Sequence, residues 1–318
     1  MTGTPLPPRG SFSVRPARPS DDALLVEGVG VEPVAWVASA QLREEMATGN
    51  YRLEWSWIAE RDGRTIGRAL WWGREDAGRP ATLDCLWVAD PADHPEDVGA
   101  ALVRAGLDSF GPGPALEFNV DVDVDWPSDP AAVHAVRWRE RAARAGGFRL
   151  TTERVSFART DTDPRPGRSL RLSFAPAADD VFRSMFARVA AGSLDAHTLD
   201  MVAREGLDAL AEDDLHFYLS LPGDRDAWQI ATLRDGSTVG FIIPTRTAYD
   251  ASISYLGVVP EHRGKGYVHD LLAEMVHVHH ENGQHRIVGT ADRANAPMRA
   301  AFTRAGFTVS RVRIVHEQ

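Results

Sequence analysis

The sequence has only one cysteine, Cys85, and no long hydrophobic run. A single cysteine excludes an internal disulfide and a zinc site built from cysteines. No apolar stretch approaches the length that crosses a membrane, and the first residues lack the apolar core of a signal peptide. We therefore predict a cytoplasmic protein with no membrane partner, in which residues 1–10 are a disordered tail.

Basic residues are also few for a protein that binds nucleic acid. The chain has 35 Lys and Arg against 45 Asp and Glu, which gives a formal net charge of −10. Nucleic-acid-binding proteins normally carry a basic face, so we expect no nucleic-acid partner. A negative field attracts amines, which suits a cationic substrate, although an ordinary acidic surface that keeps the protein soluble gives the same composition.

The length and the pattern of the chain predict two domains. A chain of 318 residues, 43% of them apolar, is long enough for two cores. A polar, proline-rich segment at 161–168 has the composition of a linker and separates residues 11–160 from residues 169–318. The two sides end alike, with A-R-A-G-G-F at Phe148 and T-R-A-G-F at Phe307. We therefore predict two copies of one α/β fold, present as a monomer or a homodimer.

Hydrophobic periodicity predicts the same order of elements in both halves. In the second half, strands are expected at 170–174, 228–233, 238–244, 251–259, 286–290 and 307–315, and helices at 177–191, 199–210, 267–280 and 297–304. In the first half, strands are expected at 12–15, 55–61, 65–72, 82–88 and 116–124, and helices at 21–27, 34–46 and 96–107.

The most informative segment runs from Val258 to Val268 and reads V-V-P-E-H-R-G-K-G-Y-V. It lies between a predicted strand and a predicted helix. The free N–H groups and the dipole at the start of a helix favour an anion, and glycines let a ligand approach the backbone. Arg263 and Lys265 add positive charge. The segment therefore predicts a phosphate site, although it is neither a Walker loop nor a Rossmann fingerprint.

This segment resembles the pyrophosphate loop of the GNAT (Gcn5-related) N-acetyltransferases, Gln/Arg-x-x-Gly-x-Gly/Ala. Arg263 and Gly266 match that pattern, and Val268 replaces its last small residue. The later segment N-A-P-M-R-A-A-F-T-R-A-G-F resembles a second signature of the family. There Met298 stands at an alanine position and Phe302 at the usual tyrosine position.

The resemblance implies two tandem GNAT-like domains, each of the α/β (α+β) class with a mixed, mostly antiparallel sheet flanked by helices. It also implies acetyl-CoA as cofactor, transfer of its acetyl group to a primary amine of a small molecule, and no metal. The residues that it assigns to the cofactor are Val258, Val259, Arg263, Gly264, Lys265, Gly266, Tyr267, Val268, Asn295 and Phe302.

The matching loop of the first half, Asp90 to Gly99, is acidic. It reads D-P-A-D-H-P-E-D-V-G, with four carboxylates, one glycine and no lysine or arginine. Because a pyrophosphate would meet like charge there, we predict a degenerate copy that does not bind CoA in the usual way. Two alternatives remain: a divalent-cation site, or acidic side chains that complement a helix dipole.

The catalytic groups are less clear than the cofactor loop. Phe302 has no proton to give, so Tyr255 or Tyr267 is a substitute acid, or else both are structural. For the base, Asp250 acts directly, or Ser252 and Ser254 hold a water; Asp250 is equally explained as a turn residue. Asp292 holds the substrate ammonium or caps the helix at Asn295.

Two further clusters have a simpler explanation. The histidines between 269 and 285 lack a carboxylate or cysteine at a metal-site spacing, which favours a solvated helix end. The acidic residues that alternate with valine over 119–125 indicate a solvent-exposed strand face, or a wall that attracts a cationic substrate.

Other functions remain open. The chain is alternatively a protein N-acetyltransferase, or a non-catalytic sensor that binds acyl-CoA. An aminoacyl-tRNA-dependent transferase is the least consistent with an acidic chain and an intact cofactor loop.

Overall fold

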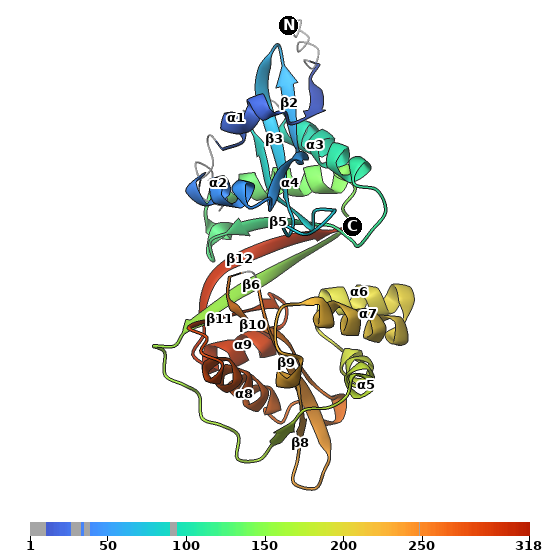
Figure 1. Ribbon diagram of the computed structural model, residues 1–318, viewed down its shortest axis with the longest axis vertical. Coiled ribbons are helices and arrows are strands. Elements are labelled where there is room, and N and C mark those ends of the chain that lie inside the picture. The colour runs from blue at the N-terminus through green and yellow to red at the C-terminus, as the bar shows by residue number, and fades with distance from the viewer. Residues whose placement is uncertain (1–10, 27–32, 35–38, 90–93, 248) are drawn as a thin grey trace, which may run out of the picture. The chain divides into compact units, whose positions relative to one another are not determined.

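The computed structural model describes residues 11–26, 33–34, 39–89, 94–247 and 249–318 (Figure 1). Its contacts divide the chain into two compact units. The first contains Met1–Thr152 and Val312–Gln318, and the second contains Glu153–Arg311. No helix in the described ranges is long and apolar enough to cross a membrane.

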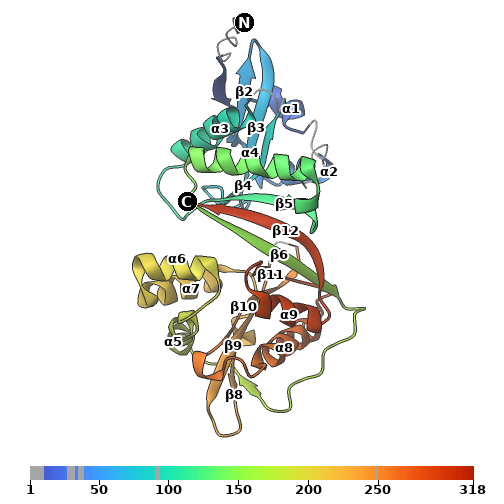
Figure 2. The same ribbon diagram turned by 180° about the vertical axis from the view of Figure 1, so that it is seen from behind.

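The first unit is a mixed sheet between two pairs of helices (Figures 1 and 2). Its strands, in spatial order, are β1 (Ser13–Pro16), β2 (Tyr51–Arg61), β3 (Arg64–Trp72), β4 (Thr82–Val88), β5 (Glu117–Val122) and the last part of β12 (Thr308–Glu317). The helices are α1 (Asp22–Val26), α2 (Ser39–Ala47), α3 (Pro95–Ser109) and α4 (Pro130–Gly146). Helices α3 and α4 cover the main core, and α1 and α2 cover a smaller one.

The second unit repeats this plan. Its strands, in spatial order, are β6 (Leu150–Thr160), β11 (Arg286–Asp292), β10 (Ala251–Val258), β9 (Thr238–Arg246), β8 (Gln229–Thr232) and β7 (Ser173–Ala175). Helices α8 (Tyr267–Glu281) and α9 (Ala296–Arg304) cover one face. Helices α5 (Asp179–Ala190), α6 (Ala196–Glu205) and α7 (Leu207–Ser220) lie on the other face. Each sheet is mixed and mostly antiparallel, which confirms the predicted fold class.

Each sheet contains one parallel pair of strands that soon parts. In the first unit, the pairing of β4 with β5 ends at Leu83 and Phe118. In the second, the pairing of β10 with β11 ends at Ile253 and Gly289. A register shift next to each parting point leaves one extra residue, Asp84 in β4 and Ser254 in β10. A bulge of this kind bends the strand, so each unit has an opening between two parallel strands.

The last strand of each sequence repeat crosses from one unit to the other. Most of β6 belongs to the second unit, where it pairs with β11, and Val312–Glu317 of β12 pairs with β5 in the first. The predicted boundaries, 11–160 and 169–318, divide the chain between the two sequence repeats. The two compact units instead exchange the ends of β6 and β12.

Candidate functional site

The loop before α8 presents a row of free amides. Gly264 and Gly266 have φ of 74° and 76°, a left-handed conformation that glycine adopts without strain. Within the described residues, the N–H groups of positions 264–268 donate no hydrogen bond, and Gly266 provides no side-chain cap for α8. Successive free N–H groups around left-handed residues form a concave anion site, which the helix dipole reinforces. The geometry therefore suits a phosphate, as the sequence predicts.

Arg263 is held by the protein itself. Its Nη1 donates to the carbonyls of Ala191 and Gly192 at 2.7 and 2.9 Å, and its Nη2 donates to Val189 at 2.6 Å. Its Nε donates to Val258 at 3.1 Å. The sequence assigned this guanidinium to a phosphate, but these bonds satisfy carbonyls at the carboxyl end of α5. Arg263 thus fastens the loop to α5.

Another arginine, Arg171, lies beside the loop. Its Nε and Nη2 both donate to Oδ2 of Asp270, its guanidinium lies 4.3 Å from the centre of the Tyr267 ring, and its Nη1 donates to the carbonyl of Lys265 at 3.2 Å. Lys265 Nζ donates to the carbonyl of Glu261 at 3.0 Å. No motif links position 171 to the loop, so this contact could not be predicted from the sequence.

The open edge of β10 adjoins the loop. The Val259 N–H donates to Val239 on β9 at 2.9 Å, so by alternation the main-chain groups of Leu256 and Val258 face the β11 side. No ladder pair is formed with β11 beyond Ile253 in the described chain. The Val258 carbonyl accepts from Arg263, which leaves the Leu256 carbonyl and amide for a ligand. The sequence predicted cofactor contacts at Val258 and Val259, but the Val258 carbonyl and the Val259 amide already have partners within the protein.

The face of β10 that is covered by α5 and α7 carries an aromatic cluster. The ring of Tyr255 is stacked on Phe186 of α5 at 5.6 Å and lies tilted against Tyr218 of α7 at 5.3 Å. Asp214 lies one helical turn before Tyr218 on the same face of α7. Burial, with Asp213 and Asp195 as further causes, raises the pKa of Asp214 to about 7. The sequence prediction missed this carboxylate, although it stands on the apolar stripe of Ala211 and Leu215.

The predicted catalytic and substrate residues on β10 and β11 have structural partners. Asp250 pairs with Arg286 in the turn before β10, and the Ser254 hydroxyl is hydrogen-bonded to that of Thr245. Asp292 accepts from the Ala196 N–H at 2.8 Å and thereby holds the start of α6.

Two residues assigned to the cofactor from α9 also serve the fold. Asn295 Oδ1 caps α9 by accepting from the Met298 N–H at 3.2 Å. Phe302 is 1% exposed, is stacked 4.6 Å from Phe157, and lies against Gly289 at the parting point of β10 and β11.

The first unit differs from the second at the start of the helix that corresponds to α8 and at the opening between its parallel strands. Helix α3 begins with Pro95, which has no amide hydrogen to offer, and Asp90 and Asp93 lie outside the described residues. The opening between β4 and β5 contains the buried side chain of Arg139, whose Nε donates to the Leu86 carbonyl at 3.1 Å. Leu86 lies two residues after the bulge at Asp84, and Leu256 lies two residues after the bulge at Ser254, so the two leucines occupy equivalent positions. The carbonyl left open in the second unit is therefore satisfied in the first.

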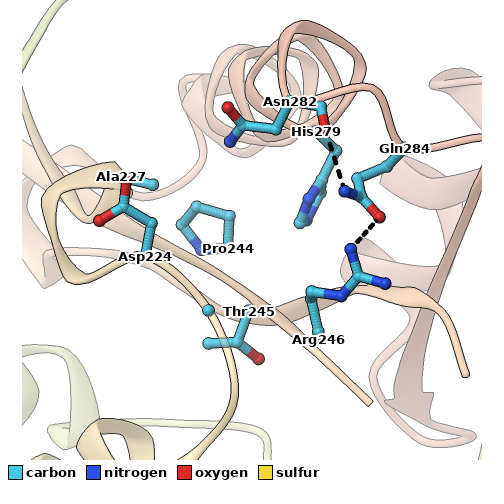
Figure 3. A pocket seen from close by; sticks show the side chains of 9 residues that line it. Asp224, Ala227, Pro244, Thr245, Arg246, His279, Asn282 and Gln284 are labelled. Atoms are coloured by element: carbon cyan, nitrogen blue, oxygen red, sulfur yellow. Dashed lines mark hydrogen bonds between the residues drawn. The ribbon is translucent and has the colours of Figure 1, made fainter. Parts of the chain in front are cut away.

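A second cavity lies at the other end of α8 (Figure 3). Its volume is about 310 Å³, and it is bounded by the turn at Asp224, the end of β9 and the last turn of α8. Figure 3 shows the hydrogen bond of Arg246 to Gln284, beside which His279 points inward. Since α8 rises about 1.5 Å per residue, His279 is roughly 18 Å from Tyr267, so this cavity is separate from the loop.

The other clusters noted in the sequence have individual partners. His277 bonds to the Pro166 carbonyl and His279 to that of Ser252, while His285 pairs with Asp161. Asp121 forms a bidentate pair with Arg313. Strand β5 ends at Val122, before the remaining acidic residues of that segment.

Comparison with known proteins identifies the kind of domain. Residues 180–308 match the family model for an acetyltransferase (GNAT) domain. No curated protein is significantly similar in sequence. A GCN5-related N-acetyltransferase from Sphaerobacter thermophilus is 20% identical, covers 99% of this chain and 96% of its own, and has a TM-score of 0.59.

Two further solved structures are similar. A glucosamine N-acetyltransferase region of a fungal multi-domain GH3 beta-N-acetylglucosaminidase is 15% identical over 96% of this chain and 38% of its own, with a TM-score of 0.51. A tandem GNAT protein from the clavulanic acid biosynthesis pathway is 17% identical over 97% of this chain and 98% of its own, with a TM-score of 0.48. At such identities, structural similarity shows the fold alone.

Proposed function

We propose that the chain transfers the acetyl group of acetyl-CoA to a primary amine of a small molecule, because residues 180–308 match the family model for an acetyltransferase (GNAT) domain. In this proposal the second unit alone holds the cofactor. The free amides at positions 264–268, next to the open edge of β10, are the observation that carries it.

The residues present fit the pyrophosphate and the pantetheine arm of the cofactor. A pyrophosphate suits the amides between Gly264 and Val268, and the space around a Cβ at Gly264 is empty. The pantetheine arm extends β10 through the amide and carbonyl of Leu256, as a strand added to a sheet edge does. Met298 is half-buried and packs against the same core cluster as Leu256 and Val258, so we assign it an apolar contact with the arm.

Acetyl-CoA supplies an activated acetyl group as a thioester. The protein has to bind the amine, remove its proton and favour the developing oxyanion. A thiolate with a pKa near 8.5 leaves well without a strong acid, so phenylalanine at position 302 is compatible with turnover.

The first unit contributes no second cofactor site in this proposal. Pro95 removes an amide at the start of α3, and Arg139 occupies the strand opening. A protein of this design binds one acetyl-CoA per chain.

Calorimetry with acetyl-CoA tests the cofactor part. We expect one site per chain, lost in Gly266→Val, because valine is strained at a φ of 76°. The matched control is Gly236→Val, at a φ of 86° in the turn between β8 and β9, which should cost similar strain and leave binding unchanged. Two sites of similar affinity would contradict the single-site proposal.

Release of free thiol with a panel of amines tests the reaction. Turnover with at least one small primary amine is the expected result. Tight acetyl-CoA binding with no thiol release from any amine would instead support the sensor alternative, and turnover only with protein amines would support a protein acetyltransferase.

A further inference from the structure

Asp214 is a carboxylate on the inner face of a helix. It shares the stripe of α7 with Ala211, Leu215 and Tyr218, the first two of which are almost fully buried. Asp214 itself is half-buried, and among the residues that the structure describes its carboxylate accepts no hydrogen bond. A half-buried carboxylate without a hydrogen-bond donor costs free energy, which a bound cation would offset.

Several charged groups lie near Asp214, and three of them, Asp195, Arg154 and Arg263, have other partners. On α6, Asp195 caps the helix by accepting from the Thr198 N–H at 2.9 Å, and His197 favours the ionised form of Asp214. On α7, Asp213 is exposed and opposes it. Arg154 of β6 lies near Tyr218 and forms an ion pair with Asp292. Arg263 of the loop lies near Tyr255 and donates to main-chain carbonyls.

Aromatic rings form the wall beside this carboxylate. Tyr218 and Tyr255 lie 5.3 Å apart, and the exposed ring of Phe217 lies edge-on 5.1 Å from Tyr218. Burial, with the charge of Asp214 as the next cause, raises the pKa of both tyrosine hydroxyls, so they stay neutral. Neutral π faces next to one carboxylate suit an ammonium.

This wall also adjoins the open edge of β10. Tyr255 follows the bulge at Ser254 and directly precedes Leu256, whose main chain faces the opening. An amine held between Asp214 and Tyr255 would therefore lie next to the place proposed for the thioester end of the cofactor.

We propose that Asp214, Tyr218 and Tyr255 form the acceptor subsite, in which Asp214 binds the ammonium of a monoamine with an aromatic or aliphatic body and takes up its proton. This inference rests on the proposed acetyl transfer. Asp195 caps α6 and Asp213 is exposed, so Asp214 is the carboxylate that lies on the inner stripe of α7 beside the aromatic wall. One such carboxylate matches one ammonium, whereas a polyamine or an aminoglycoside needs several acidic partners.

The chemical step balances without another reactant. The ammonium gives one proton to the Asp214 carboxylate, and the freed nitrogen lone pair forms a bond to the thioester carbonyl carbon. The carbon–sulfur bond then breaks with its electron pair on sulfur, and the second nitrogen proton ends on the thiolate. Asp214 returns its proton to water, so the products are the amide, the thiol and one proton.

The test uses full-length protein and three amines, 2-phenylethylamine, spermidine and kanamycin, with thiol release followed from pH 5.5 to 9. We expect kcat/KM for 2-phenylethylamine to rise through pH 7 and to exceed the values for the other two. Asp214→Asn should lower it about 100-fold or more and remove the rise, because general bases contribute 10²–10⁴-fold. Asp213→Asn, one residue away and exposed, is the matched control and should keep both features.

Calorimetry with acetyl-CoA on the same variants shows whether the cofactor site is intact. Tyr218→Phe should retain activity, and Tyr218→Ala should raise KM for 2-phenylethylamine about tenfold through loss of the wall. An unchanged pH profile in Asp214→Asn, or a preference for spermidine, would overturn the inference while acetyl transfer stands. Absence of thiol release by the unmodified protein with all primary amines would overturn both.

Discussion

Arg139 donates from its Nε to the carbonyl oxygen of Leu86 at 3.1 Å, inside the opening between β4 and β5. Arg139 of α4 and Met298 of α9 lie at the same spacing before a glycine with positive φ, Gly147 in the first unit and Gly306 in the second. An arginine therefore stands in the first unit where a methionine stands in the second. In our proposal, this exchange is one reason why the fold, used twice, holds a single cofactor.

Arg139→Met should destabilise the first unit without creating a cofactor site. The Leu86 carbonyl would lose its donor in a buried place, which costs about 1–3 kcal/mol. Thermal unfolding should show a lower Tm, and calorimetry should still give one acetyl-CoA per chain. Arg137→Met on the exposed side of α4 is the control and should leave Tm nearly unchanged. A second bound acetyl-CoA would mean that Arg139 alone closes the first unit.

The reverse change, Met298→Arg, should weaken acetyl-CoA binding. The new guanidinium can reach the Leu256 carbonyl that we assign to the pantetheine arm, so ligand and side chain compete for it. We expect Kd to rise at least about tenfold, the equivalent of one lost hydrogen bond. Met298→Leu, which keeps an apolar side chain, serves as the comparison. Equal affinity in both variants would place the arm elsewhere.

Arg263→Lys should impair both stability and cofactor affinity. A lysine cannot make the hydrogen bonds by which Arg263 joins Val258 to the end of α5. We expect a loss of about 1–3 kcal/mol in unfolding free energy, with weaker acetyl-CoA binding because the loop loses its brace. Arg188→Lys, in an exposed pair with Glu261, should change little. If the affinity for acetyl-CoA fell while the unfolding free energy stayed the same, the result would indicate that Arg263 binds the phosphate directly.

Phe302→Tyr should not restore a catalytic acid. The Phe302 ring is buried against Phe157 and Gly289, so an added hydroxyl would lack both space and a partner. We expect a loss of about 1–3 kcal/mol in stability and no increase in kcat. A higher kcat would show that the hydroxyl reaches the sulfur through the strand opening.

The stability of Asp214→Asn should depend on pH. The Asp214 carboxyl has a folded pKa of about 7, above its value of about 3.9 in the unfolded chain, so the folded protein holds the proton more tightly. Ionisation therefore lowers stability as pH rises from about 4 to 7. Asparagine removes this loss, so the gain in Tm should be larger at pH 8 than at pH 4. An equal gain at both values would show that the carboxyl titrates normally.

The sequence predicted the fold because its periodic patterns are local. Strand β4 has the predicted bounds, and α8 begins at the predicted Tyr267. The exchange of β6 and β12 was not predictable, because alternation along a strand shows which side is buried but not which sheet it joins.

The left-handed turns of the loop at Gly264 and Gly266 were predictable for the same reason, since its glycines and charges are contiguous. Asp214 was missed because the predicted helix stopped at residue 210, past which α7 in fact continues to Ser220. The role of Arg263 depends on α5 carbonyls, which no spacing in the sequence links to the loop.

The crossing of β6 and β12 makes the two halves unsuitable for separate study. A chain cut at the 161–168 linker would yield an amino-terminal fragment without Val312–Glu317 beside β5, and a carboxyl-terminal fragment without β6 beside β11. Each fragment would expose an unpaired strand edge, the surface through which β proteins associate wrongly. Mixing the two fragments offers a complementation assay, in which recovery of acetyl-CoA binding reports that both missing strands have returned.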